Sequence, residues 1–241
     1  MSGTAERYDL PGRTRTGGNR RMAKREDAAI EAQDKSPRKK KWLQRQQAII
    51  DTSAKVFAQR GFHGTSTMEL CDANELGKGA LYYYIGSKVQ LLAAIHDRVM
   101  DEVMVGADRV ALSGQSPTEQ LALLGDELLD VIARYPDHVW VFLHDFPALT
   151  GEYAEEFRRR RREFERRVEV IFVAGMESGE FREIEPRLAA RAWLGMHNYT
   201  YLWLKAGGRL SAQEVAKSFA DIFVCGINSR RPNASQRPQR T

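Results

Sequence analysis

The stretch that decides the fold runs from residue 67 to residue 88 and reads TMELCDANELGKGALYYYIGSK. Leu70 and Ala73 are three residues apart, as a short helix with one face on a core requires. Asn74 tolerates left-handed backbone angles and Gly77 permits close approach, so we expect a turn between two short helices here. This layout predicts a helix-turn-helix, whose second helix lies in the DNA major groove.

The second of these helices is nearly bare at its start and aromatic at its end. Gly79 and Ala80 would let the backbone come close to DNA, and Tyr82–Tyr84 spread around the helix by about 100° each, so they cannot all be buried. Phenol and ammonium groups are ordinary phosphate contacts. Ser87 is a helix cap, which leaves Lys88 at a helix N-terminus, where a phosphate binds well. A plain helical hairpin with surface tyrosines is the alternative.

The segment from Gln46 to Leu92 resembles the DNA-binding domain of the tetracycline-repressor (TetR) family. The resemblance is carried by AIIDTSAKVFA at 48–58, RGFHGTST at 60–67, KGALY at 78–82 and SK at 87–88. The chain departs from the family pattern at Asn74-Glu75, where the family usually has Ala-Gly. The resemblance implies DNA contacts by Thr67, Gly77, Lys78, Gly79, Ala80, Tyr82, Tyr83 and Lys88.

Charge is unevenly distributed along the 241 residues, whose net charge is +5. Residues 1–41 hold 12 Lys/Arg against 6 Asp/Glu, and residues 228–241 hold 4 Arg and no acid, so residues 42–227 are mildly acidic. The two basic ends are polar, and we predict that they are disordered. A basic arm beside a helix-turn-helix holds phosphates or enters the minor groove; a solubilising tail is the alternative.

Beyond Leu92 the pattern stays helical, with no sustained strand alternation. Pro117, Pro136 and Pro186 lie where helix starts accept proline. We therefore predict an all-α fold, with an N-terminal three-helix helix-turn-helix DNA-binding domain and a C-terminal helical ligand-binding and dimerisation domain. The predicted helices cover 41–59, 67–73, 78–84, 88–111, 117–135, 136–144, 151–178, 186–205 and 212–225.

The predicted helix 151–178 carries an arginine on its apolar stripe. Arg161 lies between Phe157 and Phe164 at helical spacing, and a charge on such a face needs an anion. That anion is either the carboxylate or phosphate of a ligand, or an internal partner, for which Asp145 and Glu152 are candidates. An arginine that reaches water at the mouth of the core is a further alternative. The stripe comprises Phe157, Phe164, Val168, Ile171, Phe172 and Gly175.

The predicted helix 186–205 is apolar on both sides, so both sides should be buried. One side would pack on the core and the other on a partner subunit, together with the helix 212–225. This four-helix interface is also the dimerisation mode that the resemblance implies. Two recognition helices about one DNA turn apart would then read a palindrome. The interface candidates are Leu194, His197, Tyr201, Val215, Phe219 and Ile222.

Aromatic and polar side chains mix in the body, as they do in ligand pockets and also in ordinary cores with satisfied histidines. The resemblance implies a ligand-responsive body, in which binding shifts the separation of the two heads. The segment YLWLKAGGRLS at 201–211 resembles the branch that controls lipid, fatty-acid or steroid catabolism, some members of which bind CoA thioesters. The ligand candidates are Trp140, His144, Arg161, Phe164, His197 and Tyr201, with Arg161 first for an anionic group.

Other classes of protein find little support. Cys71 and Cys225 lack metal-ligand spacing, the five histidines are scattered, and Gly77-Lys78-Gly79 lacks the spacing of a phosphate-binding loop. We expect no enzyme activity, no metal and no cofactor. We see no signal peptide and no apolar run long enough to span a bilayer, so we expect a cytoplasmic protein with no membrane partner.

Together these patterns predict a homodimeric, ligand-responsive transcriptional regulator. It would most often be a repressor, released from a palindromic double-stranded DNA operator by a small-molecule effector that is lipid-derived or a CoA thioester. A ligand-independent DNA-binding protein with a solid body, or an activator, is the alternative. The predicted segments are a disordered basic arm (1–40), a helix-turn-helix domain (41–92), a ligand-binding and dimerisation domain (93–227) and a disordered basic tail (228–241).

Overall fold

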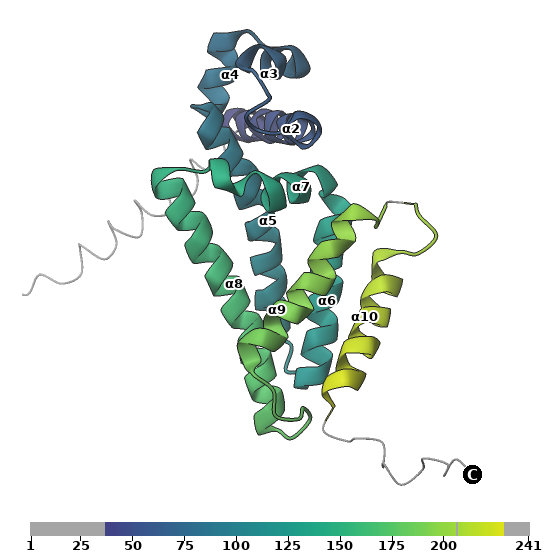
Figure 1. Cartoon of the computed structure of the whole chain (residues 1–241). Coiled ribbons are helices and arrows are strands. Elements are labelled where there is room, and N and C mark those ends of the chain that lie inside the picture. Colours follow the sequence, from purple (N-terminus) through teal and green to yellow (C-terminus); the bar gives the residue numbers. More distant parts are fainter. Residues whose placement is uncertain (1–36, 206, 229–241) are drawn as a thin grey trace, which may run out of the picture. The chain divides into compact units, whose positions relative to one another are not determined.

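The computed structural model describes residues 37–205 and 207–228. Nearly all of the predicted basic arm (1–40) and basic tail (228–241) lies outside the described residues. Within them the chain forms nine α-helices and two 3-10 helices, with one isolated antiparallel bridge between Phe181 and Asn228 (Figure 1). The predicted all-α fold class is confirmed.

Within the described residues, the chain divides between Gln47 and Ala48 into two units. Helix α2 (Pro37–Arg60) begins earlier than the predicted residue 41, because proline is favoured in the first turn and the following Arg and Lys residues are good helix formers. From Ala48 onwards α2 packs with α3 (Thr67–Asn74) and α4 (Lys78–Ile85). We call residues 48–87 the head. Its core holds Ile49, Ala54, Phe57, Leu70 and Leu81.

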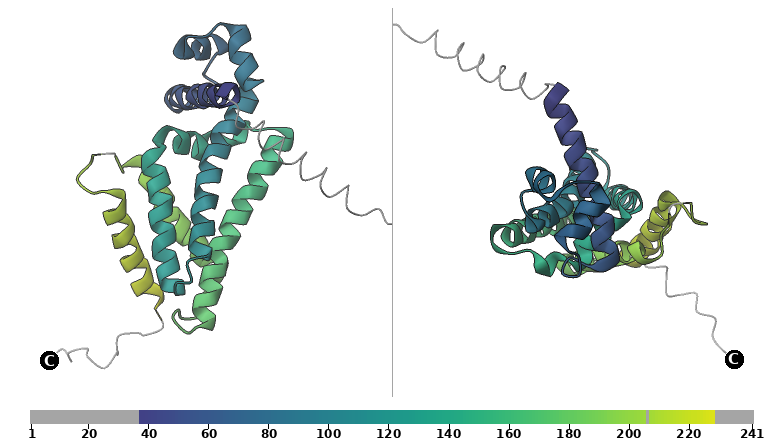
Figure 2. Two further views of the ribbon diagram at one scale, coloured as in Figure 1. Left: turned by 180° about the vertical axis from the view of Figure 1, so that it is seen from behind. Right: turned by 90° about the horizontal axis from the view of Figure 1, so that it is seen from above.

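The body follows the head and is built from six helices. From behind, Figure 2 shows α10, α6, α5 and α8 in a row, and α9 lies across the other side of this row, as Figure 1 shows. The apolar stripe predicted on α8 is buried in the core. The elements are α5 (Lys88–Ala111), α6 (Pro117–Arg134), α7 (Pro136–His144), η1 (Phe146–Ala148), α8 (Gly151–Glu177), α9 (Pro186–Asn198), η2 (Tyr199–Leu202) and α10 (Ala212–Ile227).

Helix α9 is shorter than predicted, because the α-helix ends at Asn198 rather than at residue 205. The hydroxyl of Thr200 donates to the carbonyl of His197 at 2.7 Å, an acceptor that a continuing α-helix would offer to the amide of residue 201. Thr200 is fully buried, so this local bond is protected from water. The chain tightens into η2 and then leaves the helix axis.

Two apolar clusters form the core of the unit that begins at Ala48. One lies among α5, α6, α8, α9 and α10, and the other joins the head to α7 and the first turns of α8. Helix α7 contributes to both, since Val139 belongs to the body cluster and Val141 to the head cluster. The partly buried Phe142 packs against both clusters. This short helix therefore stands between the head and the body core.

Candidate DNA-binding head and effector pocket

The head presents α4 on a well-anchored support. Ser66 and Glu69 form a capping box at the start of α3, which satisfies the first amides of that helix. Leu81 and Ile85 bury one side of α4 in the head core. Gly77 precedes α4 in extended conformation, and a Cβ built on it or on Gly79 meets nothing within 4 Å. The start of α4 is thus open to a close partner.

The predicted DNA contacts fall into an exposed and a half-buried group. Tyr83 is the most exposed of the three tyrosines, at 70 %. The hydroxyl of Tyr82 lies 3.3 Å from that of Thr67, which ties the middle of α4 to the start of α3. Both of these side chains are half-buried. The remaining exposed positions are Gly77, Lys78, Gly79 and Ala80.

Lys88 has a structural contact that the sequence did not reveal. Its ammonium group donates to the carbonyl of Phe62 at 2.5 Å and lies 4.3 Å from the centre of the Phe62 ring. Burial lowers the pKa of Lys88, while the nearby carboxylates of Asp145 and Glu69 oppose that shift. Lys88 therefore binds the head itself in this structure, rather than lying free at the helix N-terminus.

The turn of the helix-turn-helix uses a different residue from the one expected. Glu75, not Asn74, takes the left-handed conformation, with φ 55° and ψ 44°. Asn74 is instead buried, and its amide donates to the Ser53 hydroxyl at 3.2 Å and to the Leu70 carbonyl at 2.8 Å. The left-handed position is therefore the one where the resembled family usually has glycine.

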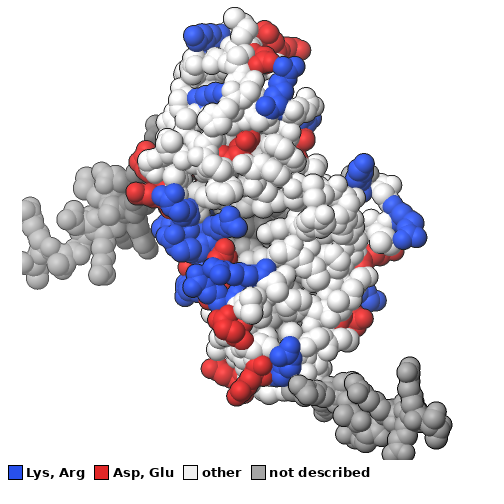
Figure 3. Space-filling model, in the orientation of Figure 1, with Lys and Arg blue, Asp and Glu red and all other residues white. Residues whose placement is uncertain are grey.

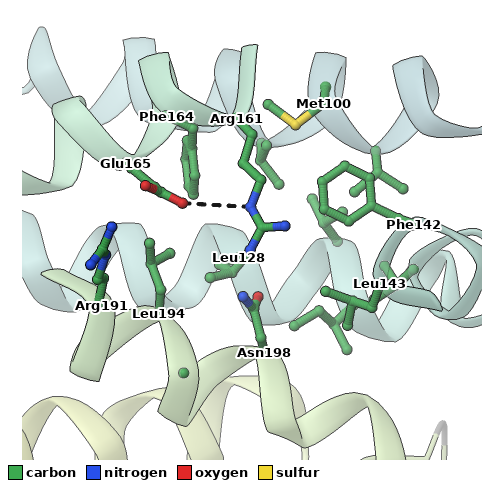
Figure 4. Close-up of a pocket in the computed structure, with 16 residues that line it drawn as sticks. Met100, Leu128, Phe142, Leu143, Arg161, Phe164, Glu165, Arg191, Leu194 and Asn198 are labelled. Atoms are coloured by element: carbon green, nitrogen blue, oxygen red, sulfur yellow. Dashed lines mark ion pairs between the residues drawn. The ribbon is translucent and has the colours of Figure 1, made fainter. Parts of the chain in front are cut away.

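A pocket opens in the body among α5, α6, α7, α8 and α9, with a cavity of about 360 Å³ (Figure 4). Its wall is mostly apolar and combines aliphatic side chains with Phe142 and Phe164. This composition is typical of small-molecule sites. The other apolar lining residues are Val99, Met100, Val103, Leu128, Val131, Ile132, Val139, Leu143, Leu194 and Gly195.

Four polar side chains, Arg161, Glu165, Arg191 and Asn198, line this pocket. Figure 4 shows Arg161 reaching from α8 towards Asn198 of α9, with Arg191 and Glu165 beside Leu194 and Phe164. The Arg161 Nε atom lies 3.5 Å from Glu165 Oε1, and the Arg161 side chain is 45 % exposed. This is a long contact in a wet setting, so it holds Arg161 only weakly.

Two of the six predicted ligand residues, Arg161 and Phe164, line this pocket. The expected internal partners of Arg161 were wrong, because Asp145 accepts a hydrogen bond from the Phe62 amide and Arg161 pairs with Glu165. The more buried arginine of the run is Arg160, whose side chain is 18 % exposed and bridges to α5 through Asp97 at 3.0 Å and Asp101 at 2.5 Å.

The other four predicted ligand residues lie outside the pocket lining. The ring centres of His144 and Trp140 lie 4.2 Å apart in a stack, and His144 Nε2 lies 3.0 Å from the Tyr201 hydroxyl. His197 is buried against Trp193, and its Nδ1 lies 2.8 Å from the Trp193 carbonyl. Burial lowers the pKa of His197 to about 4, so it packs as a neutral ring.

Sequence reasoning missed Glu165, Arg191 and Asn198 as pocket residues. Arg191, Gly195 and Asn198 recur at helical spacing along α9, which is the signal that could have grouped them. Only the tertiary structure places this stripe opposite Arg161 of α8. Among the described residues, no three His, Cys, Asp or Glu side chains gather as a metal ion would require.

The predicted interface residues are mostly turned inwards. Leu194, His197 and Val215 are buried within the chain, and Tyr201 and Phe219 are half-buried. Ile222 is 65 % exposed. An apolar groove lies open between α9 and the end of α10. In Figure 3 a broad uncharged area lies beside the arginines of α8. The groove is lined by Arg182, Ile184, Glu185, Leu188, Ala189, Ala192, Phe223 and Ile227.

A three-helix head whose last helix, α4, is open to a partner, joined to a helical body with a pocket, defines a helix-turn-helix DNA-binding regulator. Two family models match the chain. The model described as bacterial regulatory proteins, tetR family, covers residues 49–95, and the tetracyclin repressor-like C-terminal domain covers residues 114–227. The chain belongs to the TetR family of transcriptional regulators.

Individual relatives agree with this assignment. The chain is 27 % identical over 198 residues to the HTH-type transcriptional repressor KstR2 of Rhodococcus jostii (strain RHA1), covering 77 % of this chain and 92 % of the relative. The crystal structure of AibR in complex with isovaleryl coenzyme A and operator DNA is similar at 30 % identity and TM-score 0.67, with 78 % of this chain and 100 % of that chain covered. The TetR family regulator PfmR from Thermus thermophilus matches at 27 % identity and TM-score 0.70, with 76 % of this chain and 99 % of that chain covered.

No helix within residues 37–205 or 207–228 combines the length and apolar character that a bilayer crossing requires.

Proposed function

We propose that this protein is a homodimeric repressor that leaves its operator when an acyl-CoA thioester binds in the body pocket. The observation that carries the proposal is the pocket itself, an apolar cavity with Arg161 and Arg191 at its polar part. The acyl chain would lie among the aliphatic side chains of α5 and α6, and the arginines would bind the anionic carrier. AibR, which has been crystallised with isovaleryl coenzyme A and operator DNA, supports this ligand class.

The size and charge of the pocket favour a ligand that is only partly enclosed. A cavity of about 360 Å³ lies at the lower end of the range for small-molecule sites, so it suits an acyl group and part of its carrier. Arginine is the residue best matched to phosphate groups. The exposed arginines of α8, which Figure 3 shows clustered on one face, would contact the phosphates outside. They include Arg158, Arg159 and Arg162.

In the proposed complex α4 lies in the major groove. Lys78 and Tyr83 are exposed and are the side chains best placed for DNA, and the bare Gly79 and Ala80 allow close approach. A test compares Lys78→Ala and Tyr83→Ala with Lys217→Ala, an exposed lysine of α10, on a duplex that the protein has selected from a random-sequence pool. We expect the first two to weaken binding about tenfold, and Lys78→Ala to lower the salt slope by about one.

A loss of affinity in Lys217→Ala equal to that in Lys78→Ala would remove α4 from the proposed interface.

The first experiment on the effector is native mass spectrometry of the protein purified from its host, compared with the denatured mass. We expect a dimer that carries the mass of an acyl-CoA. Calorimetry with isovaleryl-CoA, longer acyl-CoAs, free CoA and the matching free acids then separates the contributions of chain and carrier. If no acyl-CoA binds, or if a bound one leaves the DNA affinity unchanged, the effector part of the proposal is wrong.

A further inference from the structure

Helix α7 presents different sides to the pocket and to the head. Val139 and Leu143 line the pocket, whereas Val141 lies in the apolar cluster of the head. His138 lies in α7 and Asp145 is the C-cap of that helix. The two residues are about two helical turns apart, which places them on the same side as Val141. A nine-residue helix has little room to bend, so a change on its pocket side moves its head side too.

Two sets of polar contacts join that side of α7 to the head. The Phe62 amide donates to Asp145 Oδ2 at 3.1 Å, while Lys88 donates to the carbonyl of the same Phe62 at 2.5 Å. At the other end of α7, His138 Nε2 lies 3.1 Å from Asp51 Oδ1 of α2, close enough for an electrostatic contact but not aligned for a hydrogen bond. We call these five residues the α7 latch.

The latch is shielded from water at its centre. Phe62 is 7 % exposed and His138 is 5 % exposed, so the backbone groups of Phe62 depend on protein partners. Burial raises the pKa of Asp145, and the hydrogen bond from the Phe62 amide is the first of the effects that oppose the shift. The two hydrogen bonds to Phe62 are partly buried, so they hold one geometry more firmly than fully exposed ion pairs do.

We propose that the α7 latch couples the pocket to the DNA-binding head. In this inference, which rests on the proposed function for its effector, a ligand against Val139 and Leu143 shifts α7, and Asp145 and His138 carry that shift to α2 and to the loop at Phe62. Asp51, Phe62, His138 and Asp145 act by positioning the head and do not line the pocket. The head of each subunit then changes its orientation with the occupancy of the pocket.

Hydrogen exchange of the full-length protein tests the latch without any effector. The probe is the duplex that the protein selects from a random-sequence pool. By linkage, DNA binding at the head must also change α7. We expect the duplex to slow exchange at least threefold in the peptide covering 136–145 of the wild type and of Asp137→Ala, a control on the same helix. In Asp145→Ala the duplex should protect α4 but leave α7 unchanged.

The conservative variant separates coupling from folding. Asn keeps an oxygen that can accept from the Phe62 amide, so Asp145→Asn should restore most of the response of α7. Should Asp145→Ala fail to fold, Asp51→Ala, at a half-exposed carboxylate, removes the other contact and should reduce the response. If the duplex slows hydrogen exchange in α4 of the wild type but leaves the exchange rate of α7 unchanged, the proposal is wrong.

The effector experiment distinguishes failure of the latch from failure of the proposed function. With saturating isovaleryl-CoA, we expect the wild type and Asp137→Ala to lose about tenfold in DNA affinity, within the usual range of allosteric coupling. Asp145→Ala should lose less than threefold while calorimetry shows unchanged ligand affinity. Equal coupling in both variants would overturn the latch. If no acyl-CoA binds, the proposed effector is wrong, and the hydrogen exchange result alone decides the latch.

Discussion

At the scale of single residues, the turn of the helix-turn-helix contains a side chain in a conformation that favours glycine. Glu75 has φ 55°, and left-handed backbone costs a residue with a Cβ about 1 kcal/mol or more. We expect Glu75→Gly to raise the free energy of unfolding by about 0.5–1 kcal/mol, since the relief of strain exceeds the entropy that glycine adds to the unfolded chain. Urea denaturation measures the difference.

The matched control for this prediction is Glu75→Ala, which removes the carboxylate but keeps the Cβ. A gain in stability as large as that of Glu75→Gly would trace the effect to charge and not to the backbone.

Arg161 is the residue on which the proposed ligand class depends most. Because its contact with Glu165 is long, an incoming anion can replace that partner. Arg161→Ala should raise the Kd for an acyl-CoA at least tenfold, as expected for a hydrogen bond between charged groups worth about 1.5–3 kcal/mol. Arg166→Ala is the control on the same helix, since Arg166 is 67 % exposed and lies outside the pocket lining. Calorimetry that finds equal affinities for both variants would count against Arg161 as the anion site.

At the scale of elements, α9 and α10 leave apolar side chains open to solvent. Leu188 is 67 % exposed and Ile222 is 65 % exposed, beside the groove at Ala192 and Phe223. Such a surface is typical of a protein interface, and we propose that a second copy covers it.

The proposed interface predicts that Ile222→Glu is a monomer at micromolar concentration by light scattering, because a carboxylate without a partner is costly to bury. Val170→Glu, at a 57 % exposed position of α8, should remain a dimer. A dimeric Ile222→Glu would place the interface elsewhere.

At the scale of the whole molecule, two buried histidines link stability to pH. Burial lowers the pKa of His96 and of His197 to about 4, and backbone hydrogen bonds to Leu92 and Trp193 oppose the shift only in part. An unfolded histidine titrates near 6.5, so between pH 6.5 and 4 the unfolded chain binds protons that the folded chain does not. Stability must therefore fall as the pH is lowered through this window.

From pH 7 to pH 5 we expect each of these histidines to cost at most about 2 kcal/mol of unfolding free energy. Urea denaturation at both pH values measures the loss. His96→Asn/His197→Asn should reduce the difference between the two pH values, whatever its stability at pH 7, and His63→Asn at an exposed ring serves as control. An unchanged pH dependence in the double variant would show that other groups control it.

Local sequence determined most of the helices. Ser66, Ser116 and Ser211 each begin a capping box with the Glu three residues later, so these starts follow from short-range chemistry alone. Periodic apolar residues likewise predicted the buried stripe of α8. The main misjudged end was that of α9, where the buried hydroxyl of Thr200 competes with the helical hydrogen bond.

What the sequence by itself determined is the family, the helical pattern and the residues of the turn and second helix, because these depend on neighbours within a few positions. The tertiary structure decided which side of α9 is buried and which arginine of α8 faces the pocket. It also decided that Lys88 and Asp145 both hold Phe62. Such pairings depend on the angles at which distant helices cross, and side-chain spacing along one helix carries no information about them.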